Sequence, residues 1–111
     1  MSQLDEALPE SPDAAELSIK DRWHHARLLR GQGEFRAALA ECLAIADARD
    51  ATWSPIAELE AARIDLGPLA DPEQAIAVAE RAIREWPSSA LAAEARELRC
   101  RARSQLGRAC D

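Results

Sequence analysis

The stretch from residue 71 to residue 89, DPEQAIAVAERAIREWPSS, constrains the fold more than any other part of the chain. Asp71 suits the N-cap of a helix, Pro72 suits its first position, and Pro87 ends the run. Between these two ends, one face of the helix carries small or apolar residues: Ala75, Ala79, Ala82 and Trp86, with Ile76 and Ile83 beside them. The stretch therefore predicts a short amphipathic helix that packs closely against neighbouring helices.

The composition favours a helical protein with a core of small side chains. Alanine, which has the best intrinsic helix propensity, is the commonest residue, and 48% of the chain is hydrophobic. Only 4% of the residues are aromatic and tyrosine is absent, so the core must be built from alanine, leucine and isoleucine. A chain of 111 residues is long enough for one domain with a single core.

Four further segments carry helix start and stop signals, such as the Ser11-Pro12 and Ser54-Pro55 pairs and the stops at Gly33 and Gly67. With the stretch above, the expected helices cover residues 11–30, 34–49, 56–66, 72–86 and 90–106. Their connections are short, so consecutive helices must fold back antiparallel. We therefore predict an all-α fold of five helices in antiparallel hairpins over residues 11–107, after a flexible acidic arm at 1–10 and before a tail at 108–111.

Small and aromatic residues recur at characteristic spacings in these hairpins. Counting from Gly33, Phe35 takes an aromatic position and Ala38 an alanine position, while Ala26 takes a small position in the preceding helix. Ala75, Ala82 and Pro87 repeat the alanine and proline spacing in the fourth helix. This pattern resembles the tetratricopeptide repeat (TPR). The resemblance implies an α-solenoid of about two degenerate repeats plus a capping helix, in which the first helix of each hairpin lines a concave groove.

The segment from residue 87 to residue 107, PSSALAAEARELRCRARSQLG, looks like part of the TPR domains of bacterial cell-envelope proteins, such as FecR-associated domains and outer-membrane assembly lipoproteins. The resemblance implies a non-enzymatic protein–protein interaction scaffold or adaptor of bacterial type. It would bind a peptide, a helix or a partner subunit through its groove or its helix ends, without a cofactor. The alternative is a structural subunit that self-assembles or packs into a larger complex.

Two cationic stripes are candidate partner-binding sites. On the expected groove face of the first helix the residues are Lys20, Trp23, Arg27 and Arg30, and on the last helix they are Arg96, Arg99 and Arg103. A cationic stripe beside an indole suits an acidic or carboxylate-ending peptide. The alternatives are that Trp23 belongs to the core, that the arginines near the end of the first helix only complement its dipole, and that the last helix is a solvated cap.

Charge and residue spacing argue against several other functions. The net charge of −6 opposes a general nucleic-acid role, and no stretch is apolar for long enough to span a membrane. His24 and His25 are adjacent on a helix and cannot jointly hold a metal ion, so we expect no metal site. Cys42, Cys100 and Cys110 match no zinc or redox spacing and are expected to be ordinary thiols, unless the chain turns back after Gly107 and brings Cys100 to Cys110.

The compartment depends on whether further sequence precedes the chain. Residues 1–19 are acidic and lack the apolar run of a signal peptide. We expect a cytoplasmic protein if the chain is complete and a periplasmic one if it is a domain excised from an envelope protein.

Overall fold

The computed structural model describes the backbone of residues 12–110 and the side chains of residues 19–110, and five helices make up this part of the chain. They are α2 (Pro12–Gly31), α3 (Phe35–Asp47), α4 (Trp53–Leu66), α5 (Pro72–Glu85) and α6 (Ala92–Gln105). No strand occurs between residues 12 and 110. The prediction of an all-α fold with five helices is confirmed. The expected acidic arm at residues 1–10 lies outside the described residues.

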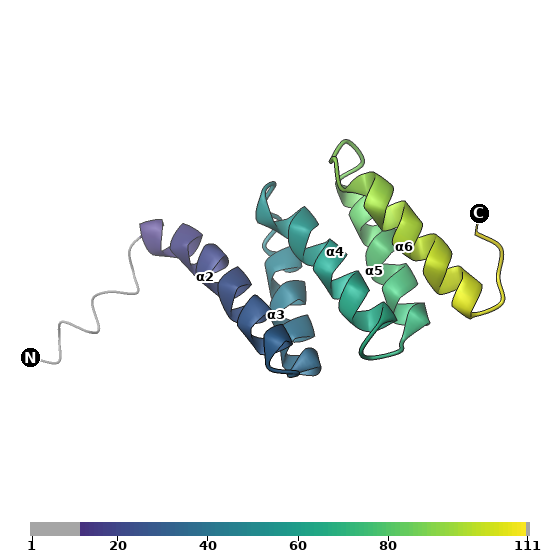
Figure 1. Ribbon diagram of the computed structural model, residues 1–111. Coiled ribbons are helices and arrows are strands. Elements are labelled where there is room, and N and C mark those ends of the chain that lie inside the picture. Colours follow the sequence, from purple (N-terminus) through teal and green to yellow (C-terminus); the bar gives the residue numbers. More distant parts are fainter. Residues whose placement is uncertain (1–11, 111) are drawn as a thin grey trace, which may run out of the picture.

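The helices form two layers (Figure 1). Each helix packs antiparallel against the next one along the chain, and α4 also contacts both α2 and α6. Helices α2, α4 and α6 therefore make one layer, and α3 and α5 make the other. The predicted helical hairpins are present, and the first helices of successive hairpins lie side by side.

Local hydrogen bonds explain where α4 and α5 begin. The Asp71 carboxylate accepts a bond from the backbone N–H of Gln74 at 3.1 Å, with Pro72 at the first helical position, as the sequence predicted. Helix α4 begins at Trp53, earlier than predicted from Ser54-Pro55. The reason is Asp50, whose side chain accepts bonds from the N–H groups of Thr52 and Trp53 at 2.9 and 2.8 Å.

Helix α4 is the centre of the core. From Ser54 to Leu66 nearly every residue is buried, because α2, α3, α5 and α6 all pack on this helix. The other buried core residues are mostly alanines with a few larger side chains: Trp23, Ala26, Ala38, Cys42, Ile45, Ala75, Ile76, Val78, Ala82, Ala95, Leu98 and Ala102. Small side chains let the helix backbones approach closely, as the composition predicted.

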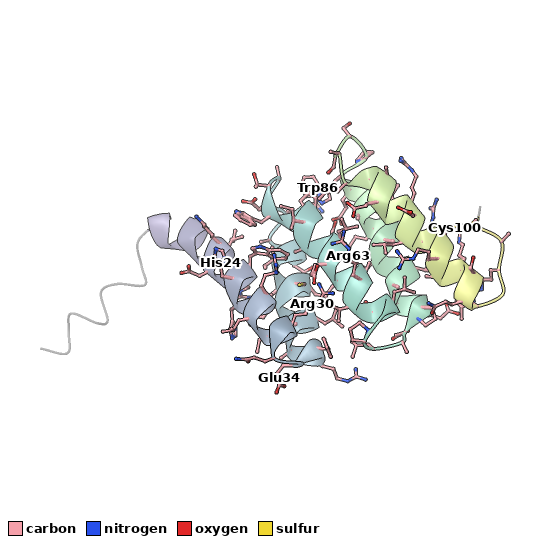
Figure 2. The ribbon with its side chains drawn as sticks, viewed as in Figure 1. His24, Arg30, Glu34, Arg63, Trp86 and Cys100 are labelled. Carbon is pink, nitrogen blue, oxygen red and sulfur yellow. A yellow bond between two sulfur atoms is a disulfide. The ribbon has the colours of Figure 1, made fainter. Side chains whose placement is uncertain are left out.

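The cysteines differ from the expectation of three free thiols. Cys42 is free and buried, and burial raises the pKa of its thiol to about 12, so this thiol is unreactive. Cys100, labelled in Figure 2, forms a disulfide with Cys110, and the two Cα atoms are 4.4 Å apart. The chain turns back at Gly107, whose φ of 73° suits glycine. Arg103 Nη1 then donates to the Cys110 carbonyl at 2.9 Å, so the expectation was wrong for this pair.

Candidate functional site

A groove opens on the layer formed by α2, α4 and α6. Its volume is about 350 Å³, and its lining combines three arginines with apolar and small residues: Arg30, Arg63, Leu66, Gly67, Pro68, Leu98, Arg101 and Gln105. We call this surface the arginine groove. Leu66 and Leu98 are buried and form its apolar floor, while the exposed Arg101 lies at its α6 side.

A chain of ion pairs crosses the groove from one helix to the next. Arg30 of α2 pairs with Glu60 of α4, Arg63 pairs with the same Glu60 at 3.5 Å, and Arg63 also pairs with Glu94 of α6. Glu60 is only 6% exposed, so both guanidinium groups hold a desolvated carboxylate. Figure 2 shows Arg30 and Arg63 on the same face of the molecule. These pairs fix the two arginines in position and tie the three helices together.

Arg101 differs from the other two arginines of the groove. It forms no ion pair with any residue from 19 to 110, whereas Arg30 and Arg63 are paired. A guanidinium with all its donors available can bind a carboxylate in bidentate fashion. The groove therefore offers one free and two partly engaged guanidinium groups above an aliphatic floor.

No protein-family model, no curated protein and no solved structure matches this chain. Within residues 12–110 no helix is long and apolar enough to cross a membrane, and no three His, Cys, Asp or Glu side chains gather where they could hold a metal ion.

The predicted stripe on α2 is split by the structure. Trp23 is only 8% exposed and its ring lies 6.3 Å from that of Trp53, so this indole belongs to the core and is not open to a partner. The Arg27 guanidinium lies over the Trp23 ring at 5.7 Å and remains exposed, as does Lys20. Arg30 lines the groove. The charged groups of Lys20, Arg27 and Arg30 therefore remain on this face of α2.

The predicted stripe on α6 lies outside the groove. Arg103 pairs with Glu80 of α5 at 3.2 Å and also holds the Cys110 carbonyl. Arg99 is half-buried and Arg96 is exposed, and neither lines the groove. Sequence reasoning missed Arg63 and Arg101. The signal for Arg63 was its i, i+3 spacing from Glu60 on the same helix.

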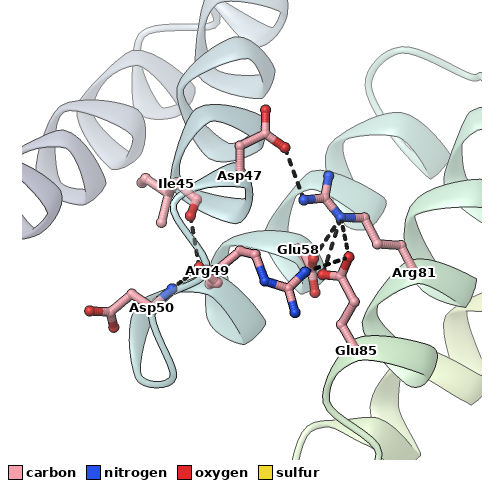
Figure 3. Close-up of polar contacts among 8 residues, drawn as sticks. Ile45, Asp47, Arg49, Asp50, Glu58, Arg81 and Glu85 are labelled. Atoms are coloured by element: carbon pink, nitrogen blue, oxygen red, sulfur yellow. Dashed lines mark hydrogen bonds and ion pairs between the residues drawn. The ribbon is translucent and has the colours of Figure 1, made fainter.

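A second polar cluster joins α3, α4 and α5 (Figure 3). Glu58 of α4 is fully buried, and its Oε2 lies 3.1 Å from Arg81 Nε on α5. Arg81 also pairs with Asp47 at 2.9 Å and with Glu85 at 3.2 Å, and Arg49 pairs with Glu85 at 3.3 Å. The cluster connects the two hairpins on the layer opposite the groove.

The two glutamates of this cluster differ in protonation. Burial, followed by the hydrogen bond to Glu85 and the charge of Glu85, raises the pKa of Glu58 to about 8. Burial also acts on Glu85, but its hydrogen bonds with Glu58 and Arg81 hold the pKa of Glu85 below the usual value. Burial therefore favours the protonated form of Glu58 at neutral pH, whereas the arginines favour the ionised form of Glu85. The cluster is therefore a structural acid pair inside the protein.

Proposed function

We propose that the protein is a non-enzymatic, TPR-like scaffold that binds an acidic peptide segment of a partner protein in the arginine groove. The observation that carries this proposal is the combination of three guanidinium groups with an aliphatic floor on the layer made by α2, α4 and α6. The resemblance to TPR domains of bacterial envelope proteins supports the same assignment.

The chemistry of the groove defines the ligand. A carboxylate of the partner meets Arg101 and the remaining donors of Arg30 and Arg63, and an aliphatic side chain beside it covers Leu66 and Leu98. The lining includes no nucleophile and no general base, which suits binding. An extended segment in which acidic and aliphatic residues alternate satisfies both requirements.

The Cys100–Cys110 disulfide supports a location for this scaffold. Disulfides persist in oxidising compartments such as the bacterial periplasm. This favours the periplasmic alternative, and mass spectrometry of the protein from fractionated cells tests it: a bridged pair in the periplasmic fraction supports it, and free thiols in the cytoplasm contradict it.

Exposed tryptophans would favour the alternative, a self-assembling structural subunit. Trp23 is buried, and Trp53 and Trp86 are half-buried, so none of the three offers a fully exposed indole. Light scattering at high concentration tests the alternative directly, since a strict monomer contradicts it.

Binding of a defined probe tests the groove. The probe is a fluorescein-labelled peptide in which glutamates alternate with leucines, and a peptide with lysines in place of the glutamates is its control. We expect the Arg101→Glu variant to bind the acidic peptide at least about tenfold more weakly, because it places a carboxylate where the ligand carboxylate must lie. Arg96→Glu, on the same helix but outside the groove, should bind as the wild type does. Equal losses in both variants would show that the groove is not the binding surface.

A further inference from the structure

We infer that the acidic amino-terminal segment of this chain, residues 1–11, docks against the α2 wall of the arginine groove and competes there with the partner peptide. The inference rests on the proposed function and adds regulation to the same site. We use the name α2 wall for the face of α2 that carries Lys20, Arg27 and Arg30; Arg30 lines the groove, and Lys20 and Arg27 lie on the same face beyond its lining.

Charge complementarity is the first argument. Residues 1–11, MSQLDEALPES, carry Asp5, Glu6 and Glu10 and contain no lysine, arginine or histidine. The protein as a whole has a net charge of −6, of which these three carboxylates supply −3, so the rest of the chain is also acidic on balance. The α2 wall is a local exception, because Lys20 and Arg27 are exposed and form no ion pair within residues 19–110.

The three cations of the wall share one face of α2. Lys20, Arg27 and Arg30 recur with helical spacing, and Trp23 lies between them on that face. Trp23 packs on Trp53 of α4, and Arg30 pairs with Glu60 of α4. The face is therefore the one turned toward α4, where the groove opens.

The sequence of the segment matches the ligand class proposed for the groove. In residues 4–8, LDEAL, two carboxylates stand between Leu4 and Leu8. These residues supply the same combination of carboxylate and aliphatic side chain that the guanidinium groups and the floor of the groove require. The segment is thus a chemical mimic of the proposed partner peptide.

The chain is long enough to reach the wall. Helix α2 begins at Pro12, and Arg30 stands about 27 Å further along its axis at 1.5 Å per residue. The chain from Pro12 back to Asp5 spans about 24 Å when extended, at roughly 3.4 Å per residue. A segment that runs back along α2 therefore brings Asp5 level with Arg27 and to within about one helical turn of Arg30.

Because the segment belongs to the same chain as the α2 wall, even a weak contact between them is well occupied. A short tether gives an effective concentration in the millimolar range, so even a millimolar contact occupies the wall for much of the time. The partner peptide must displace it, which reduces the apparent affinity. We expect neutralising Asp5, Glu6 and Glu10 to raise the affinity for the acidic peptide by about 2- to 10-fold, and to do so most at low salt.

Paramagnetic relaxation in the full chain tests the docking. A nitroxide is attached to a Ser2→Cys variant, and Cys42 is not labelled because it is buried. We expect broadening of the amide signals of Lys20, Arg27 and Arg30, with little at Arg81 and Glu85 on the other layer. The D5N/E6Q/E10Q variant should lose this broadening. Absent broadening, or broadening that survives the neutral variant, overturns the inference.

A mixing experiment separates docking within one chain from docking between two. Isotope-labelled chains without nitroxide are mixed with spin-labelled chains at natural isotope abundance. Broadening that appears in this mixture assigns the contact to a second copy and overturns the inference as stated. Signals that stay sharp in the mixture, but broaden when both labels share one chain, support it.

Peptide affinity separates failure of the inference from failure of the proposed function. If Arg101→Glu weakens peptide binding but D5N/E6Q/E10Q leaves it unchanged, the groove function stands and the competition is overturned. The opposite outcome is that neither the wild type nor D5N/E6Q/E10Q binds the peptide, while the wild type still shows the paramagnetic broadening. The docking then stands and the proposed function fails.

Discussion

Single buried polar residues control stability in this protein because its core is made of small apolar side chains. Ser54 is fully buried, and its hydroxyl donates to the Ile45 carbonyl at 2.7 Å and accepts from the Asp50 N–H at 2.8 Å. Figure 3 shows Ile45 and Asp50, the two residues that Ser54 joins. This hydroxyl closes the connection between α3 and α4.

We predict that Ser54→Ala destabilises the fold by about 1 to 3 kcal/mol, because it removes both hydrogen bonds of a fully buried hydroxyl, one to the Ile45 carbonyl and one from the part-buried Asp50 N–H. Urea unfolding followed by circular dichroism measures the change. Ser104→Ala, at an exposed position on α6, is the control and should change little. A loss as small as that of the control would mean that the two bonds of Ser54 do not support the connection.

Glu58 predicts an unusual pH dependence. The folded protein holds the proton of Glu58 up to about pH 8, whereas the unfolded chain releases it near 4.5. The folded state thus binds more protons in this window, and its stability falls as pH rises from about 4.5 to about 8. Burial and the charge of Asp71 raise the pKa of Asp65 to about 6, so ionisation of Asp65 also lowers the stability as pH rises. The lowered pKa of Glu85 acts only at lower pH, and Asp65 is mostly ionised above pH 7, so Glu58 contributes most of the change between pH 6 and pH 8.

We predict that wild type loses on the order of 2 kcal/mol more stability than Glu58→Gln between pH 6 and pH 8, from 1.4 kcal/mol per pH unit for one proton. Urea midpoints at several pH values provide the comparison. Glu97→Gln, at an exposed position on α6, should keep the slope of the wild type. Parallel curves for wild type and Glu58→Gln would show that Glu58 is already ionised in the folded state.

At the scale of elements, the end of α6 is held by more than helix packing. The disulfide to Cys110 fixes the last residues across α6, and Arg108 Nη2 pairs with Glu73 Oε2 of α5 at 2.6 Å. Arg103 binds both the Cys110 carbonyl and Glu80 of α5. The last hairpin is therefore closed by a segment that ties α6 back to α5.

We predict that reduction of the Cys100–Cys110 bond destabilises the fold by about 2 kcal/mol, as expected for a crosslink that closes a short loop. Thermal unfolding with and without a phosphine reductant measures this. Cys110→Ser should already have the lower melting temperature and should no longer respond to the reductant. A wild type that melts at the same temperature in both conditions would mean that the bond adds nothing to the packing of α6.

An element could be predicted from the sequence when the residues that determine it lie close together in the chain. The helix from Asp71 was predicted because its cap, proline and apolar face lie within one stretch. The start of α4 was misplaced because Asp50 and Ser54 both offer a capping oxygen, and only packing decides between them. The disulfide depends on the turn at Gly107, whose direction sequence leaves open.

At the scale of the whole molecule, the groove arises from three helices that are far apart in sequence. Arg30 was a sequence candidate because it continues a stripe on α2, but Arg63 and Arg101 join it only when α4 and α6 align beside α2. The loop after residue 66 left the register of α4 open in the sequence. In the structure, the pair of Arg30 with Glu60 joins α2 to α4, and the pair of Arg63 with Glu94 joins α4 to α6.

The central claim is that the arginine groove binds carboxylates of a partner. The most direct measurement is the set of arginine Nε–Hε signals in a nitrogen-15 spectrum during titration with the glutamate–leucine peptide, each signal assigned by an Arg→Lys variant. We predict that Arg30, Arg63 and Arg101 shift together with one saturation curve, while Arg96 stays in place. A titration that moves Arg96 as much as Arg101, or moves none of the three groove arginines, would contradict the account.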